Sequence, residues 1–208
     1  IETFLSRVVS EYCQRAWVDY SVSTAYSPSR TLKNNSEEKF LMIKIIISTF
    51  LLSLVVVNPA YAEKLLLELK GGIVEIQLLP EKAPQHVARI KELAEEGFYN
   101  GIVFHRVIEG FMSQTGDPTG TGRGGSGKKI KAEFNNEKHT RGSVSMARSS
   151  RPNSADSQFF IVLKDSLFLD GQYTVWGRVV KGMEFVDTIR RGEPPRNPDK
   201  IISMRVEK

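Results

Sequence analysis

The sequence predicts a mainly β protein, a closed antiparallel barrel capped at its ends by two helices. The chain has 16 glycines, most of them in its second half, which is typical of a turn-rich β protein. Short apolar runs with turn residues between them recur from residue 64 onward. Only two segments have the period of a helix. Many short strands with few helices favour such a barrel.

The first two strands are predicted at Leu65–Leu69 and Ile73–Leu78, joined by a tight turn at Gly71-Gly72. In the second strand apolar and polar residues alternate, so one face should be buried and the other exposed to solvent. A helix is expected to begin at Pro84 and to end at Gly97, with its apolar residues on one face.

The rest of the chain alternates apolar runs with turn residues. Further strands are predicted at Val103–Ile108, Gly142–Ala147, Phe159–Leu163 and Thr174–Val180. A short helix around Met183–Arg190 and a closing strand at Ile201–Val206 complete the expected fold.

The N-terminal third has the layout of a secretory signal peptide over residues 42–62. A basic start at Met42–Lys44 precedes the apolar run Ile45–Val57, and Ala60-Tyr61-Ala62 is a cleavage motif. The run is short for a membrane-spanning helix; a retained anchor and a buried strand are the alternatives. We expect residues 1–41 to be a disordered, non-native extension translated upstream of the true start, Met42. Residues 63–208 would then act in the periplasm or, alternatively, after secretion.

The charge pattern argues against a nucleic-acid-binding protein. The formal net charge is +5 and the pI about 9.3, but basic and acidic residues are interspersed and form no basic stripe. Cys13 is the only cysteine, so residues 63–208 can form neither an internal disulfide nor a cysteine-rich zinc site. The three histidines lack metal-ligand spacing, and we predict no metal and no cofactor.

Four stretches carry a family resemblance. Residues 104–117 read FHRVIEGFMSQTGD, which meets every fixed position of the pattern FHRxIxGFMxQxGD. The others are Ser145–Ala147 with Pro152-Asn153 and Ser157–Ile161, Leu169–Gly177, and the helical segment 84–101. Taken in chain order, they resemble the cyclophilins, a family of peptidyl-prolyl cis-trans isomerases.

The resemblance implies an eight-stranded barrel with two capping helices and a substrate groove on its outer face. It implies that residues 63–208 accelerate rotation about Xaa-Pro bonds in unfolded or exposed polypeptide segments. The signal-peptide pattern implies that these segments belong to exported proteins and that the protein is not membrane-bound once the signal is cleaved. We expect a monomer, because no extra segment remains for assembly. The positions that match the family's catalytic residues are Arg106 and Gln114. Those that match its substrate-binding residues are Phe111, Met112, Ala147, Arg148, Gln158, Phe160, Phe168, Leu169 and Tyr173.

These residue types suit the chemistry. Amide resonance creates a rotational barrier of roughly 18–20 kcal/mol, so a catalyst must bind the twisted amide better than either planar form. Arg106 is a permanently charged donor for the prolyl nitrogen, and the apolar side chains would grip the ring. Gln114 could orient Arg106 or hold a substrate carbonyl, and the backbone N–H of Arg148 could anchor the chain. His105 should be structural because rotation transfers no proton.

Two motifs are interpreted as incidental. The glycine-rich loop Gly122–Lys129 is similar to a phosphate-binding loop, but Lys129 stands where a Mg²⁺-binding Ser or Thr would be. Asp170 with His139 could suggest a hydrolase, but the sequence has no Gly-x-Ser-x-Gly elbow.

Three departures from the family pattern affect ligand preference. Phe168 stands where cyclosporin-sensitive relatives have Trp, so we expect weak cyclosporin binding with isomerase activity retained. Tyr173 replaces a His that is common in animal relatives, and the Arg148–Arg151 insert is one residue longer than theirs. The alternative function is a chaperone or scaffold that captures proline-containing segments with incidental catalysis.

Overall fold

A computed structural model describes residues 63–207, which form eight antiparallel strands, two α-helices and two short 3-10 turns. The predicted signal peptide, 42–62, and the predicted extension, 1–41, lie outside the described residues. No helix of the described part is long and apolar enough to cross a membrane.

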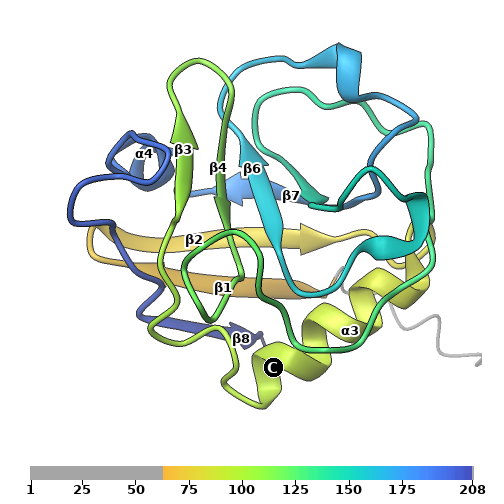
Figure 1. Ribbon diagram of the computed structural model, residues 1–208, viewed down its shortest axis with the longest axis horizontal. Helices are drawn as coiled ribbons and strands as arrows, with labels where there is room; N and C mark the ends of the chain where they lie inside the picture. The colour runs from red at the N-terminus through yellow and green to blue at the C-terminus, as the bar shows by residue number, and fades with distance from the viewer. Residues whose placement is uncertain (1–62, 208) are drawn as a thin grey trace, which may run out of the picture. The chain divides into compact units, whose positions relative to one another are not determined.

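The strands form one curled sheet in the order β3-β4-β6-β5-β7-β2-β1-β8. In Figure 1, β3, β4 and β6 run steeply, whereas β7, β2, β1 and β8 lie nearly crosswise to them. The strands are β1 (Lys64–Leu69), β2 (Gly72–Leu78), β3 (Arg106–Ile108), β4 (Met112–Thr115), β5 (Ser143–Met146), β6 (Phe159–Val162), β7 (Val175–Lys181) and β8 (Ser203–Val206).

The closed barrel is not seen in residues 63–207, because β3 and β8 remain the two edges of the sheet. The segments just before them do meet, at a single antiparallel bridge between Val103 and Lys200. Gly101 also donates its N–H to the Ile201 carbonyl at 2.7 Å. The Val103 carbonyl, however, accepts the Thr115 hydroxyl at 3.0 Å, and no regular ladder forms there. The prediction of a mainly β, antiparallel fold with two helices is confirmed, and full closure is not.

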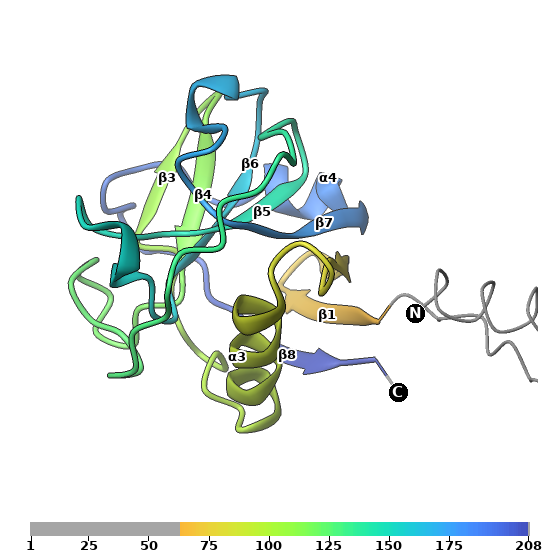
Figure 2. The ribbon, with the colours of Figure 1, turned by 90° about the vertical axis from the view of Figure 1, so that its right-hand side faces the viewer.

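The first hairpin and the first helix follow the sequence prediction. The turn needs glycine at Gly72, where φ is +150° and an added Cβ would lie 2.5 Å from the Phe185 ring. Helix α3 (Pro84–Glu95) buries the expected apolar face, and Gly97, with φ +70°, follows its end. Figure 2 shows α3 beside β8. The second helix, α4 (Met183–Asp187), contacts β2.

The start of α3 is capped from a distant part of the chain. No side chain at its own N-terminus makes a capping hydrogen bond. Instead, the Glu133 carboxylate accepts the N–H groups of Gln85 (3.1 Å) and His86 (3.0 Å), together with the buried His86 Nδ1 at 2.7 Å. This carboxylate satisfies donors that a helix N-terminus leaves unpaired and complements the helix dipole.

Two apolar clusters lie on opposite faces of β6, because successive side chains of a strand alternate between faces. Phe159 and Ile161 belong to the main core inside the curled sheet. Phe160 and Val162 belong to a second cluster with Met112 and Leu169, which we call the outer cluster. The run of four apolar residues in β6 therefore reflects burial on both sides.

Several element boundaries differ from the sequence prediction, and one strand was not predicted. The strand expected at Val103–Ile108 begins only at Arg106, and the helix expected at Met183–Arg190 ends at Asp187. Strand β4 (Met112–Thr115) was missed, because its polar Ser113 and Gln114 interrupt an apolar run that is already short. This strand is the one that joins Arg106 to the outer cluster.

Candidate active site

Three adjacent strands place the central candidate residues in a row. Arg106 of β3 lies opposite Gln114 of β4, and Gln114 lies opposite Phe160 of β6. Directly opposed residues of neighbouring strands project from the same face of a sheet. The row therefore brings a cation, an amide and an aromatic ring to one surface.

This row borders a depression of about 120 Å³ in the outer surface of the sheet. Nine of the eleven residues that the sequence singled out line it. They are Arg106, Phe111, Met112, Gln114, Ala147, Arg148, Phe160, Leu169 and Tyr173.

The floor of the depression is the outer cluster. Met112, Phe160 and Leu169 are almost fully buried there, with Phe111 and Tyr173 packed against them. The Phe160 and Tyr173 rings meet edge to face with their centroids 5.7 Å apart, a favoured aromatic geometry. The depression is thus apolar below and cationic at one side, where the Arg106 side chain keeps 41% of its surface exposed.

The other two predicted residues lie at the edges of the depression. Gln158 lines a neighbouring hollow of about 370 Å³, which shares Gln114, Ala147 and Arg148 with it. Phe168 is 66% exposed, and its ring stacks at a tilt on Phe111 with a centroid distance of 5.6 Å. It extends the apolar rim outward.

Gln114 does not orient Arg106 in this structure. Its Nε2 donates to Gln158 Oε1 at 2.8 Å, and Gln158 Nε2 in turn donates to the carbonyls of Gly122 (3.0 Å) and Gly124 (2.8 Å). The two glutamines therefore link the site to the glycine-rich loop. The partner of Arg106 is an acidic residue that the sequence did not single out, Glu193.

Arg148 contributes its side chain as well as its backbone. Its guanidinium lies 4.6 Å from the centroid of the Tyr173 ring, within the range of a cation–π contact. Its Nε also donates to the Gln172 carbonyl at 2.8 Å. The Arg148 side chain therefore packs on the ring that borders the depression.

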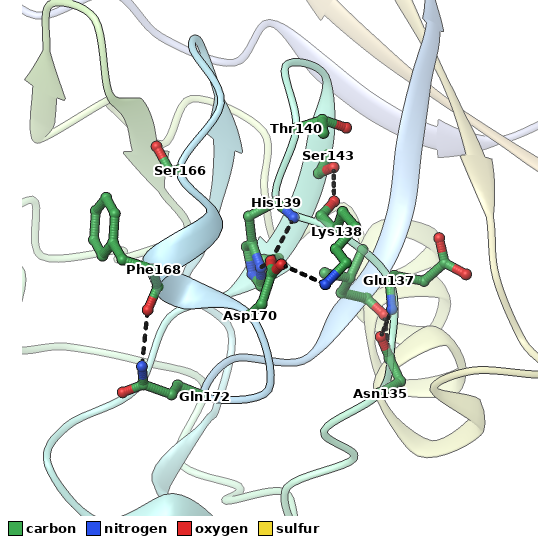
Figure 3. Close-up of polar contacts among 12 residues, drawn as sticks. Asn135, Glu137, Lys138, His139, Thr140, Ser143, Ser166, Phe168, Asp170 and Gln172 are labelled. Atoms are coloured by element: carbon green, nitrogen blue, oxygen red, sulfur yellow. Dashed lines mark hydrogen bonds and ion pairs between the residues drawn. The ribbon is translucent and has the colours of Figure 1, made fainter.

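A buried polar chain lies behind the site. His139 Nδ1 is 3.0 Å from Asp170 Oδ1, which also accepts the His139 backbone N–H (Figure 3), and His139 Nε2 is 3.1 Å from Ser145 Oγ. The imidazole stacks on Phe160 with a centroid distance of 6.2 Å. Figure 3 shows the Phe168 ring pointing away from this cluster.

The order Asp, His, Ser resembles a hydrolase triad, but burial excludes that role. His139 and Ser145 are both fully buried, so neither can reach a substrate. Burial also lowers the pKa of His139, whereas the His139 backbone N–H holds the pKa of Asp170 at about 2. We interpret the hydrogen-bonded series Asp170, His139 and Ser145 as a structural support that joins β5 to the 169–173 segment beneath Phe160.

The glycine-rich loop turns its backbone donors inward. Asp117 accepts the N–H of Gly122 at 2.6 Å, and Asp156 accepts those of Ser126 (2.7 Å) and Gly127 (3.2 Å). A phosphate-binding loop needs these N–H groups for its ligand. Here the carboxylates of Asp117 and Asp156 accept these N–H groups instead.

His105 is also buried, and burial lowers its pKa, so it is neutral at physiological pH. Within residues 63–207, no group of three or more His, Cys, Asp or Glu side chains is arranged to hold a metal ion.

Comparison with known proteins identifies the family. The model of the family described as "Cyclophilin type peptidyl-prolyl cis-trans isomerase/CLD" matches residues 64–206. The chain belongs to the cyclophilin family. This cyclophilin is therefore a peptidyl-prolyl cis-trans isomerase, as the motifs predicted.

Similar proteins agree with this assignment. A protein of Brucella suis biovar 1, described as "Probable peptidyl-prolyl cis-trans isomerase", is 50% identical over 159 residues, which cover 68% of this cyclophilin and 81% of the relative. "Peptidyl-prolyl cis-trans isomerase B" of Bacillus subtilis is 46% identical over 125 residues, covering 59% and 87% of the two chains.

Solved structures share the fold. Cyclophilin AquaCyp293 from Hirschia baltica superimposes with a TM-score of 0.63 at 32% identity and covers 69% of this cyclophilin and 73% of its own chain. A Cryptosporidium parvum cyclophilin type isomerase, crystallised in the presence of the dipeptide Ala-Pro, has a TM-score of 0.65 at 29% identity, with coverage of 70% and 99%.

Proposed function

We propose that this cyclophilin twists Xaa-Pro bonds without covalent chemistry, with Arg106 donating a hydrogen bond to the prolyl nitrogen while the outer cluster holds the ring. One observation carries the proposal. The exposed Arg106 guanidinium and the apolar side chains of Phe160 and Leu169 line the same depression. Its volume of about 120 Å³ is that of about four water molecules, a space suited to a small ring.

Both features favour the twisted amide. Twisting localises the lone pair on the prolyl nitrogen, which then accepts a hydrogen bond more strongly, and a guanidinium donates without changing its charge state. A planar amide is more charge-separated than a twisted one, so an apolar floor destabilises the planar forms relative to the transition state.

The magnitudes require both contributions. An acceleration of about 10⁴–10⁵ corresponds to roughly 5–7 kcal/mol at 1.36 kcal/mol per factor of ten. A hydrogen bond to a charged group contributes about 1.5–3 kcal/mol. The apolar floor and the positioning of the flanking peptide provide the rest, and we propose that Gln114 and the Arg148 N–H hold that peptide.

The test is exchange NMR on a short Xaa-Pro peptide with Arg106→Ala. We expect the rate of catalysed exchange to fall by about 10–150-fold, the equivalent of the lost hydrogen bond. Arg106→Lys should recover only part of it, because lysine lacks the planar fork. The matched control is Arg205→Ala on the exposed part of β8, which should exchange the peptide at the wild-type rate.

The outcome separates catalysis from capture. If Arg106→Ala exchanges the peptide as fast as the wild type, the proposed mechanism is wrong. A wild type that binds the peptide tightly but accelerates its exchange only weakly would favour the alternative of a proline-binding chaperone or scaffold.

We also propose that the clients are exported proteins and that the enzyme acts as a monomer in the periplasm, with secretion as the alternative. The support is the signal-peptide pattern at residues 42–62. Fractionation of cells producing the full chain, with N-terminal sequencing of the product, tests this. A mature N-terminus at Glu63 is expected, and a cytoplasmic product with an intact Met42–Ala62 segment would overturn the proposal.

Weak cyclosporin binding follows from Phe168, whose exposed ring has no indole N–H to donate. Phe168→Trp should tighten inhibition by cyclosporin at unchanged isomerase activity. Low-nanomolar inhibition of the wild type would contradict this expectation.

A further inference from the structure

The guanidinium of Arg106 is held by a residue from the far end of the chain. Arg106 Nε donates to Glu193 Oε2 at 2.6 Å, and the two side chains keep 41% and 51% of their surface exposed. Glu193 lies between α4 and β8, 87 positions along the sequence from Arg106. Gln114, which was expected either to orient Arg106 or to hold a substrate carbonyl, donates its hydrogen bond to Gln158 and not to Arg106.

The backbone fixes where Glu193 lies. Its neighbour Gly192 exchanges two hydrogen bonds of 2.8 Å with Val107, the residue that follows Arg106 in β3. At Gly192 φ is +146°, and an added Cβ would lie 2.5 Å from Pro195 Cα, so only glycine fits this bend. A main-chain segment that is hydrogen-bonded to β3 therefore places the Glu193 carboxylate beside Arg106.

The atom that Glu193 engages matters. A guanidinium has five N–H donors in a rigid plane, and Nε carries one of them. Pairing at Nε fixes the rotation of the plane and leaves the four N–H groups of the two Nη atoms out of this pair. A fixed plane loses less conformational freedom when it meets the twisted amide.

We propose that Glu193 is a positioning residue that acts through Arg106 and raises kcat. The proposal rests on the proposed role of Arg106. Because the pair orients a donor that is used in the transition state, its loss should lower kcat and leave KM nearly unchanged. The competing possibility predicts the opposite result. If the Glu193 carboxylate competes with the substrate for the Arg106 guanidinium, removing that carboxylate should raise kcat.

The experiment measures kcat and KM on an Xaa-Pro peptide for Glu193→Ala and Glu193→Gln. We expect Glu193→Ala to lower kcat about two- to fivefold, the range that an exposed ion pair supplies, with KM within a factor of about 1.5. Glu193→Gln keeps an oxygen acceptor for Nε and should recover part of the loss. Thermal unfolding of each variant verifies that it is folded.

The matched control is Glu109→Ala. Glu109 is an exposed glutamate at the same end of the sheet, paired with Nε of Arg191, which does not line the depression. It removes the same charge from the same region and should leave kcat unchanged. An equal loss in Glu109→Ala and Glu193→Ala would show a general charge effect and overturn the inference.

The activity of the Arg106→Ala variant distinguishes a failure of the proposed role of Glu193 from a failure of the proposed mechanism. If Arg106→Ala itself retains full activity, the proposed mechanism fails. If Arg106→Ala is slow but Glu193→Ala is unchanged, faster, or altered only in KM, the mechanism stands and the positioning role of Glu193 is refuted. In the double variant, adding Glu193→Ala should cause no further loss.

Discussion

Replacing Asp117 with asparagine tests how the chain builds the loop beside its site. Asp117 is 1% exposed and accepts four hydrogen bonds, from the N–H and hydroxyl of Thr119 (both 2.8 Å), the N–H of Thr121 (3.0 Å) and the N–H of Gly122 (2.6 Å). An amide keeps one oxygen acceptor and directs an NH₂ group at the donors on the other side. The change is nearly isosteric, so it removes charge and acceptor capacity without opening a cavity.

The pKa of Asp117 gives the magnitude. Burial alone would raise this pKa, but the hydrogen bonds from Thr119 and the loop N–H groups outweigh it and hold the pKa at about 2, against an ordinary 3.8. The ionised carboxylate is thereby favoured in the folded state by about 2 kcal/mol. We expect Asp117→Asn to lower the free energy of unfolding by about 2 kcal/mol and Tm by roughly 6–8 °C.

The assay is urea unfolding followed by circular dichroism at several pH values. A folded-state pKa below the unfolded value means that this stability is present above pH 4 and is lost as pH falls toward 2. The difference between wild type and Asp117→Asn should therefore shrink over that interval. Glu95→Gln makes the same chemical change on the exposed side of α3 and should cost less than 0.5 kcal/mol. A pH-independent difference, or one below 0.5 kcal/mol at pH 7, would refute the reasoning.

Three further changes test other supports. Glu133→Ala removes the cap of α3 and should cost about 1–3 kcal/mol in urea unfolding, whereas unchanged stability would show that water caps the helix equally well. Gly116→Ala places a Cβ 2.4 Å from the Ser157 carbonyl at φ +89°, so we expect a loss of more than 2 kcal/mol, and a soluble variant with wild-type Tm would contradict the geometry. His139→Phe keeps a ring against Phe160 but removes two side-chain hydrogen bonds. We expect it to lower the free energy of unfolding by about 1–3 kcal/mol and also to lower kcat/KM. An unchanged kcat/KM would show that His139 does not support the site.

Local structure was largely predictable because it depends on neighbours in the sequence. The alternation in β2, the apolar face of α3 and the glycine that follows this helix all act over a few residues. The family was predictable for the same reason, since residues 104–117 carry its pattern in one uninterrupted stretch. Strand β4 was missed because a run of four residues, three of them polar, is too weak a signal.

The contacts around the site were not predictable in this way. Gln114 was expected to orient Arg106 or to hold a substrate carbonyl, but the register of three strands places Gln158 within reach of its amide. Asp170 and His139 were noted as a pair, yet nothing in the sequence indicated that Ser145 would complete their chain or that all of it would lie behind Phe160. Each of these contacts joins different strands or loops.

The sequence by itself determined the family, the reaction, the mainly β fold and the residues that line the depression. The tertiary structure decided that β3 and β8 do not close the sheet into a regular barrel and that Glu193 holds Arg106. The physical reason is that strand registers and loop paths bring together side chains that are distant in the sequence, 44 positions for Gln114 and Gln158 and 87 for Arg106 and Glu193. Such placement is a property of the whole packed sheet, and no local pattern of residue types encodes it.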